Sequence, residues 1–140
     1  MISTFELTRK TTSDTDILDL TDDVAARVEQ TGVRQGQVLI FTPGSTAAIT
    51  TIEYEAGVVQ DLKQAIERLA PRQLHYDHDA RWGDGNGYSH VRSALLGGSF
   101  TVPVVDGRLA LGTWQQIVLL DFDNHGRTRR VVVQVSGETS

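Results

Sequence analysis

The first half of the chain contains short stretches whose apolar positions are typical of β-strands. Residues 2–7 carry apolar side chains at positions 2, 5 and 7, and residues 37–42 (QVLIFT) form an apolar run. After a turn that Pro43 and Gly44 impose, residues 45–55 (STAAITTIEYE) are rich in β-branched side chains. These patterns predict three strands, the third paired with the strand before it.

The C-terminal part is predicted to be almost entirely β. Its segments 99–105, 108–123 and 128–137 are separated by turn signals at Asp106-Gly107 and at residues 124–126. This spacing predicts antiparallel hairpins at the end of the chain. Apolar residues at 117–120 fall on both faces of the long middle strand. Both faces therefore need a cover, and one cover could be another subunit.

A 3.6-residue period marks the helices. Val24 and Val28 lie between a Thr21 cap and Gly32, which predicts a helix over 21–31. The segment 57–71 has apolar positions at 58, 59, 62, 66 and 69 before a proline, and residues 89–98 predict a shorter helix. The whole order indicates a compact α+β single domain over 1–140, with a mostly antiparallel sheet and two to three helices.

Composition limits the kinds of site that the chain can form. The chain has 140 residues, a net charge of -5 and no cysteine. Disulfides and thiolate sites are thereby excluded, so a metal would need His, Asp or Glu ligands. No segment is long and apolar enough to span a membrane, and no secretory signal is evident, so a cytoplasmic location is expected. The negative charge disfavours nucleic acid, whereas Arg127, Arg129 and Arg130 suit a small anion.

The stretch HYDHDARWGDGNGYSH, residues 75–90, is the main candidate for a metal site. It combines His75, His78 and His90 with three aspartates, ligands that suit Zn, Mn or Fe(II). The alternative is a solvated polar loop. His90 is the more informative histidine, because it falls in the first turn of a predicted helix and would point back at the loop.

Other patterns offer weaker candidates. Glu53 and Glu55 alternate on one strand and could act as an acid and a base, or could simply be exposed. Asp61 lies early in a predicted helix, where the helix dipole alone could explain it. Trp114 could stack on an aromatic ring of a ligand, and Gln115 could bind a polar group of the same ligand. A Trp114 that only packs in the core explains the pattern equally well. The glycine-rich GDGNG and ALLGGS match no phosphate-loop motif.

Together, STAAITTIE, YDHD, SHVRSALLG, VPVVDGRL, LGTWQ and RTRRVVVQVSGE resemble the YjbQ-type family (UPF0047) from about residue 37 to 138. The resemblance implies a compact α+β domain that assembles as a homotrimer, with sites near the subunit interfaces. It also implies a secondary thiamine-phosphate synthase activity, which joins a pyrimidine diphosphate to a thiazole phosphate and releases pyrophosphate.

The resemblance also assigns polar positions. They are Thr46, Glu53, Asp61, His78, Asp79, Asp84, His90, Thr113, Gln115, Arg129 and Arg130. From these we expect Glu53, Asp61 and His90 to be catalytic, and a divalent metal, Mg²⁺ or Zn²⁺, to be held by the histidines and aspartates His78, His90, Asp79 and Asp84. For a small phosphorylated metabolite we expect five binding residues: Thr46, Trp114, Gln115, Arg129 and Arg130.

Two positions depart from the family pattern. Gly44 stands where relatives usually have histidine, and Ile52 stands where they tend to have asparagine. The missing histidine opens an alternative function, a trimeric phosphate-, metabolite- or metal-binding protein with little or no catalytic activity.

Overall fold

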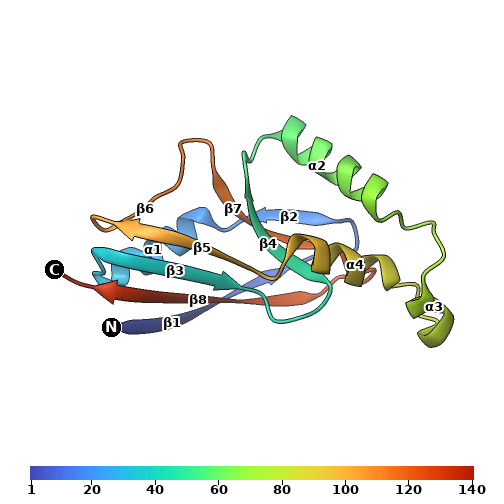
Figure 1. Cartoon of the computed structure of the whole chain (residues 1–140), viewed down its shortest axis with the longest axis horizontal. Helices are drawn as coiled ribbons and strands as arrows, with labels where there is room; N and C mark the ends of the chain where they lie inside the picture. Colours follow the sequence, from blue (N-terminus) through green and yellow to red (C-terminus); the bar gives the residue numbers. More distant parts are fainter.

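The computed structural model describes all residues from Met1 to Ser140. Two antiparallel sheets form the body of the molecule (Figure 1). The larger sheet has the order β1-β8-β3-β5-β6, and the smaller has the order β2-β7-β4. The larger-sheet strands are β1 (Ile2–Lys10), β3 (Gln35–Phe41), β5 (Ser99–Val105), β6 (Arg108–Leu109) and β8 (Thr128–Glu138). The smaller-sheet strands are β2 (Asp16–Asp19), β4 (Ala47–Ile52) and β7 (Gln116–Asp121).

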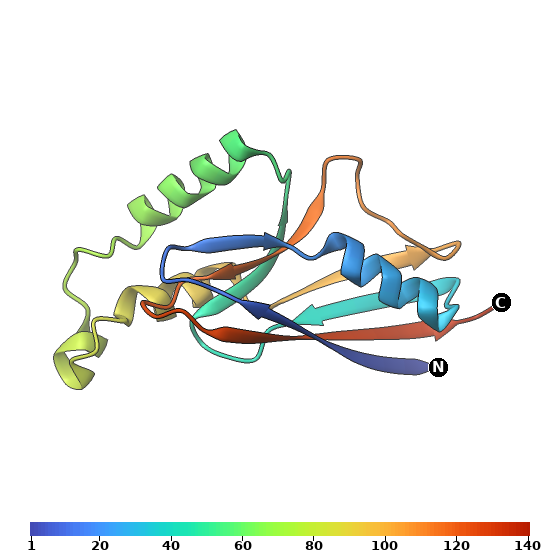
Figure 2. The same ribbon diagram turned by 180° about the vertical axis from the view of Figure 1, so that it is seen from behind.

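Four helices complete the fold: α1 (Thr21–Thr31), α2 (Ala56–Leu69), α3 (Asp77–Trp82) and α4 (Gly87–Leu96). Three of them are long, which confirms the predicted α+β class with an antiparallel sheet and two to three helices. No helix has both the length and the apolar composition needed to cross a bilayer. The two termini lie together at one end of the molecule, and α3 lies at the other (Figure 2).

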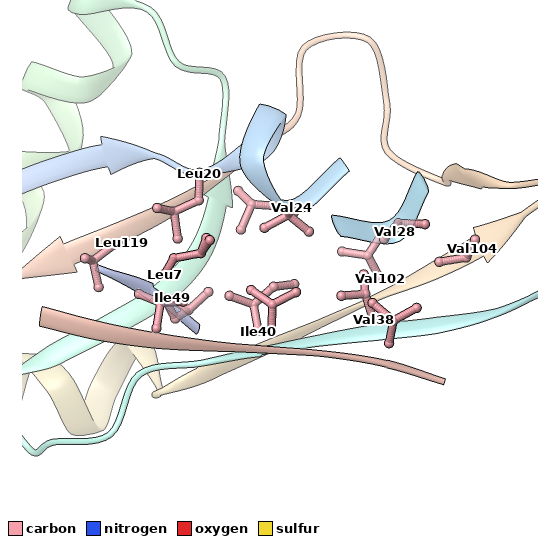
Figure 3. Close-up of a cluster of buried hydrophobic side chains, with 14 of the residues drawn as sticks. Leu7, Leu20, Val24, Val28, Val38, Ile40, Ile49, Val102, Val104 and Leu119 are labelled. Carbon is pink, nitrogen blue, oxygen red and sulfur yellow. The ribbon is translucent and has the colours of Figure 1, made fainter. Parts of the chain in front are cut away.

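The main core fills the space between the two sheets and α1. Its buried side chains include Val24 and Val28 from α1, Ile40 from β3 and Leu119 from β7 (Figure 3). A second, smaller cluster lies on the opposite face of the three-stranded sheet, where Val118 and Leu120 meet Ile66 of α2. The alternating residues of β7 therefore divide between two cores.

This arrangement corrects the argument for a second subunit over the long apolar strand. Residues 117–120 are completely buried within a single chain. The covers are the larger sheet with α1 on one face and α2 on the other. The apolar pattern of β7 thus carries no evidence of assembly.

Strand pairing also differs from the sequence-based prediction. β4 does not pair with β3, its neighbour in the chain; it pairs with β7, and β3 pairs with β5 and β8. The turn at 124–126 likewise connects two different sheets, so β7 and β8 form no hairpin. The predicted hairpin at Asp106-Gly107 is confirmed, since Val105 pairs with Arg108 and both turn residues have positive φ.

Smaller differences concern element ends. The expected Thr21 cap is wrong: Leu20 occupies the N-cap position, and an oxygen of Asp19 accepts the Thr21 N–H. Gly32 ends α1 with φ 73°, as predicted. β2 was missed because its four residues follow a polar stretch. The segment 77–82, expected to be loop, forms the short helix α3.

Candidate functional site

The histidine-rich stretch forms a cluster of potential metal ligands at the α3 end of the molecule. His78 and Asp79 lie in α3, and Asp84 lies in the loop that leads to α4. Their ligand atoms all lie within 4.8 Å of one another. His78 Nδ1 is 3.3 Å from Asp84 Oδ1 and 3.5 Å from Asp79 Oδ1. Two atoms that each bind a tetrahedral Zn²⁺ at about 2.1 Å are separated by about 3.4 Å, so the spacing fits.

The bonding around these three side chains also fits a cation. His78 Nδ1 is shielded from solvent and makes no hydrogen bond. Asp79 Oδ1 accepts the Gly87 N–H at 2.8 Å, and Asp84 Oδ1 accepts the Asn86 N–H at 3.1 Å. Backbone amides therefore orient both carboxylates, as outer hydrogen bonds do around metal ligands. His78, Asp79 and Asp84 are suited to hold a divalent metal.

His90 lies next to this cluster. It is in the first turn of α4, and its ring centroid is 4.5 Å from that of His78. Ser89 and Ser93 anchor α4 to the smaller sheet: Ser89 Oγ donates to the Phe122 carbonyl, and Ser93 Oγ donates to the Ala47 carbonyl. The helix thus holds His90 in place beside His78.

A buried network of charged side chains lies beside the histidines. The guanidinium of Arg129, only 7% exposed, donates to both oxygens of Asp121 at 2.8 and 2.9 Å and to Thr46 Oγ1 at 2.6 Å. Thr46 Oγ1 in turn donates to Asp123 at 2.9 Å, and Arg127 Nε donates to the same carboxylate at 2.7 Å. Such bidentate, charge-assisted bonds hold the arginine rigidly.

Asp123 is strongly stabilised in its charged form. Burial acts to raise the pKa of this carboxyl group. Hydrogen bonds from Arg127, Thr46, the His125 N–H and Asn86 outweigh burial and hold the pKa well below its usual range. Asp123 is therefore a permanent anion that orients Thr46 and Arg127, and it is unsuited to act as a general acid near neutral pH.

His90, Asp84 and the arginine network meet at one cavity, here named the central pocket, of about 310 Å³. Its lining residues are Gly44, Ser45, Thr46, Asp84, Asn86, His90, Asp123, Arg127 and Arg129. Gly44 has φ 137°, and a Cβ at this position would lie 3.2 Å from Arg129 Nη1. Nη1 makes no hydrogen bond to the protein and lies on the Gly44 side of the guanidinium.

Other expected site residues lie at the opposite end of the smaller sheet. Thr46 precedes β4 and Glu53 follows it, so they are about 20 Å apart at about 3.3 Å per residue. Gln115 lies just before β7, and its Nε2 donates to Thr51 Oγ1 at 3.0 Å. Trp114 beside it is 71% exposed. Within one chain, these residues do not reach the central pocket.

Four further positions also lie outside the central pocket. Asp61 is exposed on α2. Arg130 points away from Arg129 on β8, as alternate strand residues do, and its Nε is 3.6 Å from Glu6. Thr113 lines a separate cavity between α1 and the β6–β7 connection. His75 is exposed, and its Nε2 lies 3.2 Å from Asp77 Oδ1.

Comparison with known proteins identifies the family. The model of the UPF0047 protein YjbQ-like family matches residues 5–138. The chain belongs to this family. A UPF0047 protein of Archaeoglobus fulgidus is 45% identical over 92% of this chain and 98% of its own length. A UPF0047 protein of Methanothermobacter thermautotrophicus is 38% identical over 98% of this chain and 94% of its own length.

Solved structures of YjbQ-like proteins share the fold. A YjbQ-like protein of unknown function from Sulfolobus solfataricus superposes with a TM-score of 0.93 at 31% identity, covering 99% of both chains. An uncharacterised YjbQ/UPF0047 protein from Clostridium acetobutylicum gives a TM-score of 0.86 at 32% identity, covering 94% of this chain and 99% of its own. The family assignment from sequence motifs is confirmed, and it carries no established activity.

The sequence reasoning missed part of the site in this YjbQ-like chain. Asp121, Asp123 and Asn86 were not singled out, although all three are buried there. One signal was available: Asp121 and Asp123 alternate after an apolar strand, and Arg127 and Arg129 alternate at the start of the next. Two such runs facing each other indicate a buried ion network.

Proposed function

We propose that this YjbQ-like protein is a metal-assisted small-molecule enzyme of the secondary thiamine-phosphate synthase type. It would join a pyrimidine diphosphate to a thiazole phosphate and release pyrophosphate. The supporting observation is the cluster of His78, Asp79 and Asp84 beside His90. Two of these residues, Asp84 and His90, line the central pocket together with two arginines. Reactions that expel a diphosphate need positive charge around the leaving group.

Local charge explains why a cation is part of the proposal. Arg127 and Arg129 are balanced by the buried Asp121 and Asp123. Asp79 and Asp84 add two further negative charges at the same place. An anionic substrate would be repelled by this surplus unless a divalent cation reversed it. Bound at His78, Asp79 and Asp84, the cation would neutralise charge that develops on the leaving diphosphate.

The chain's own polar groups supply the remaining requirements. Arg129 Nη1 is free of protein partners and can donate to a phosphate oxygen, while its Nε and Nη2 stay fixed by Asp121 and Thr46. His90 can hold or release a proton beside the cavity, or act as a fourth metal ligand. In the reaction the C–O bond between the pyrimidine compound and its diphosphate breaks, and the diphosphate departs with the electron pair. The thiazole ring nitrogen donates its own electron pair to the same carbon, which forms the new C–N bond.

We extend the proposal to a homotrimer in which two subunits form each site. Glu53, Trp114 and Gln115 lie about 20 Å from the central pocket of their own chain. In a closed ring of subunits, one end of the smaller sheet in each subunit can face the opposite end of the smaller sheet in the next subunit. Trp114 would then line the ring-binding part of the site, and Glu53 would supply the catalytic carboxylate that the resemblance implies.

Metal analysis and an activity assay test the proposal. The purified protein should bind one divalent ion per chain and form thiamine phosphate from the two phosphorylated precursors. His78→Ala and His90→Ala should each lower the rate at least about a hundredfold, the order of effect of losing a ligand or a general acid–base group. His75→Ala is the matched control, because His75 is an exposed histidine of the same stretch that lies outside the central pocket. Unchanged metal content and rate in both histidine variants would refute the assignment.

One observation favours a second candidate, a phosphate- or metal-binding protein with little turnover. The family resemblance implies a histidine where this chain has Gly44, and Gly44 lines the central pocket. The φ of 137° is one that histidine rarely adopts, so the backbone here is adapted to glycine. This candidate predicts metal binding without thiamine phosphate formation. A rate equal to that of a histidine-bearing relative would eliminate it.

A further inference from the structure

A second polar pocket lies on the other side of α4 from the histidines. Arg92 follows His90 by two positions, which turns its side chain about 200° around the helix axis. The pocket has a volume of about 400 Å³, and no apolar residue lines it. Its wall includes Thr15, Gln60, Lys63, Gln64, Arg72 and Arg92, and we name it the Arg92 pocket.

Arg92 is a buried cation with spare hydrogen-bonding capacity. Its side chain is 2% exposed. Nε donates to the Ala70 carbonyl at 3.0 Å, and Nη2 pairs with Glu67 at 2.5 Å. Nη1 has no protein partner, although the side chain lines the pocket. Burying a guanidinium is costly, and its remaining N–H groups need acceptors.

Arg72 adds a second guanidinium. Its Nη2 donates to the Ser13 carbonyl at 3.2 Å and to Thr15 Oγ1 at 3.1 Å, both of them neutral acceptors. The guanidinium carbons of Arg72 and Arg92 lie 5.4 and 4.8 Å from the centroid of the Tyr88 ring. One buried aromatic ring thus gathers two guanidinium groups, of which only that of Arg92 has a carboxylate partner, Glu67.

The charge balance of the pocket is unusual for this chain. Three cations, Lys63, Arg72 and Arg92, face two carboxylates, Asp14 and Glu67. Only Glu67 forms an ion pair there, and the pair is with Arg92. The protein as a whole carries a net charge of -5. A local surplus of positive charge in an acidic protein marks a place that attracts anions.

The wall from α2 suggests the size and character of the ligand. Gln60, Lys63 and Gln64 are spaced as i, i+3 and i+4, so they share one face of α2. Two amides and the Thr15 hydroxyl offer donors and acceptors beyond the cations. A wholly polar cavity of about 400 Å³ suits a compact, hydrophilic molecule rather than an aromatic one.

We propose that the Arg92 pocket is a second binding site, specific for a small hydrophilic phosphate. The oxyanion accepts from Arg92 Nη1, Arg72 and Lys63, and the hydroxyl-bearing remainder contacts Gln60 and Gln64. The site is separate from the central pocket and, because it holds its own cations, it needs no metal.

A phosphate titration in the presence of EDTA tests this site alone. Inorganic phosphate, followed by glycerol 1-phosphate, is added to the full-length protein while the arginine Nε–Hε signals are recorded by NMR. Saturable shifts of the Arg72 and Arg92 signals are expected, with tighter binding of glycerol 1-phosphate. If these signals do not move while those of Arg127 and Arg129 do, the proposal is overturned.

Substitutions at the rim avoid the risk of unfolding a buried arginine. Lys63→Gln and Gln64→Glu should each weaken phosphate binding about tenfold, the equivalent of one charge-assisted hydrogen bond. Arg68→Gln, on the same helix but outside the pocket, is the matched control and should bind as the wild type does. Equal affinities in Lys63→Gln, Gln64→Glu and Arg68→Gln would overturn the proposal.

The central pocket supplies the second control. His78→Ala should keep the full affinity for phosphate in EDTA, even if it abolishes metal binding and turnover. A loss of phosphate affinity in His78→Ala, with none in Lys63→Gln, would place the anion in the central pocket and contradict this inference. The proposed enzymatic activity can therefore fail without affecting this result.

Discussion

Thr46 shows how a single hydroxyl group organises the central pocket. Its Oγ1 accepts from Arg129 Nη2 and donates to Asp123. A hydroxyl can do both at once, whereas a carboxylate can only accept and an ammonium group can only donate. Thr46 therefore links a cation and an anion that lie 3.9 Å apart. This link fixes Arg129 while leaving its Nη1 available for a ligand.

Acid stability provides a test of this network. Asp123 has a lower pKa in the folded protein than in the unfolded chain, where an aspartate titrates near 3.9. Its contribution to stability is complete above that pH and is lost as the pH falls toward the folded pKa. Asp123→Asn should lower the free energy of unfolding by about 2 to 4 kcal/mol at neutral pH, and the variant should lose less on acidification.

Urea denaturation at neutral pH and near pH 3.5 measures both effects. Asp61→Asn is the control, since it removes an exposed carboxylate on α2. It should change the free energy of unfolding by no more than about 0.5 kcal/mol. If Asp123→Asn and wild type lost the same free energy on acidification, the network would not be what stabilises the charged carboxylate.

Among the site residues, the sequence predicted those that could be metal ligands by residue type alone. His78, Asp79, Asp84 and His90 are close in the chain, so their meeting in space follows from two short helices and a loop. Asp121 and Arg129 are also close in the chain, but their alternating pattern is equally typical of two exposed strand ends. Their burial follows from β8 leaving the β7 sheet and joining the other, which local patterns do not contain.

Two glycines determine how closely β3 and β8 approach each other. Gly36 on β3 is in register with Gly137 on β8. A Cβ on Gly36 would lie 1.9 Å from the Ser136 carbonyl oxygen, and one on Gly137 would lie 2.2 Å from the Gln35 carbonyl oxygen. Both obstructing atoms belong to the backbone, so no rotamer change can relieve the overlap. The strands can pair here only without side chains.

Gly36→Ala should therefore separate β3 from β8 locally and lower the free energy of unfolding by about 3 kcal/mol. Gly98→Ala is the matched control, because the nearest atom to its Cβ would be 3.6 Å away, an ordinary contact. Urea denaturation compares the two variants, and amide exchange of Gln35 and Val38 locates the disturbance. Equal stabilities would mean that the sheet accommodates the methyl group without cost.

Helix ends and tight turns were predicted more accurately than the pairing of strands. The boundaries of α1 and the hairpin at Asp106-Gly107 depend on local signals, namely helical periodicity, Gly32 and a two-residue turn. The pairing of β4 with β7 joins segments more than sixty residues apart in the chain. A turn at Pro43-Gly44 predicts a hairpin on local grounds. The alternation of Ala47, Ala48 and Ile49 between two cores favours the other sheet.

For the whole molecule, the question is what the exposed ends of the smaller sheet contact. One end has the central pocket, and Phe41 (44% exposed) lines an adjoining cavity that shares Gly44, Ser45 and His90 with it. The other end has Trp114 (71% exposed) and Tyr54 (43%). Large apolar side chains at both ends suit a head-to-tail contact, which closes into a ring under threefold symmetry. The homotrimer proposal depends on these ends and not on the faces of β7, which its own chain covers.

Sedimentation gives the first measurement. A trimer of this 15.4 kDa chain should persist at micromolar concentration, and Trp114→Ala should weaken it. Trp82→Ala is a matched control, because Trp82 is similarly exposed, at 68%, but lies on α3. A wild-type monomer under these conditions would rule out sites shared between subunits.

Subunit mixing then tests whether neighbours share a site. Glu53→Gln and His90→Ala should each be inactive alone, because every site lacks one group. If Glu53 comes from one subunit and His90 from the next, co-refolding equal amounts should restore about one quarter of the sites, each formed by two unmodified faces. Mixing without unfolding should restore nothing while the trimers stay intact. A mixture as inactive as its components, in trimers shown by mass spectrometry to contain both chains, would place Glu53 and His90 in separate sites.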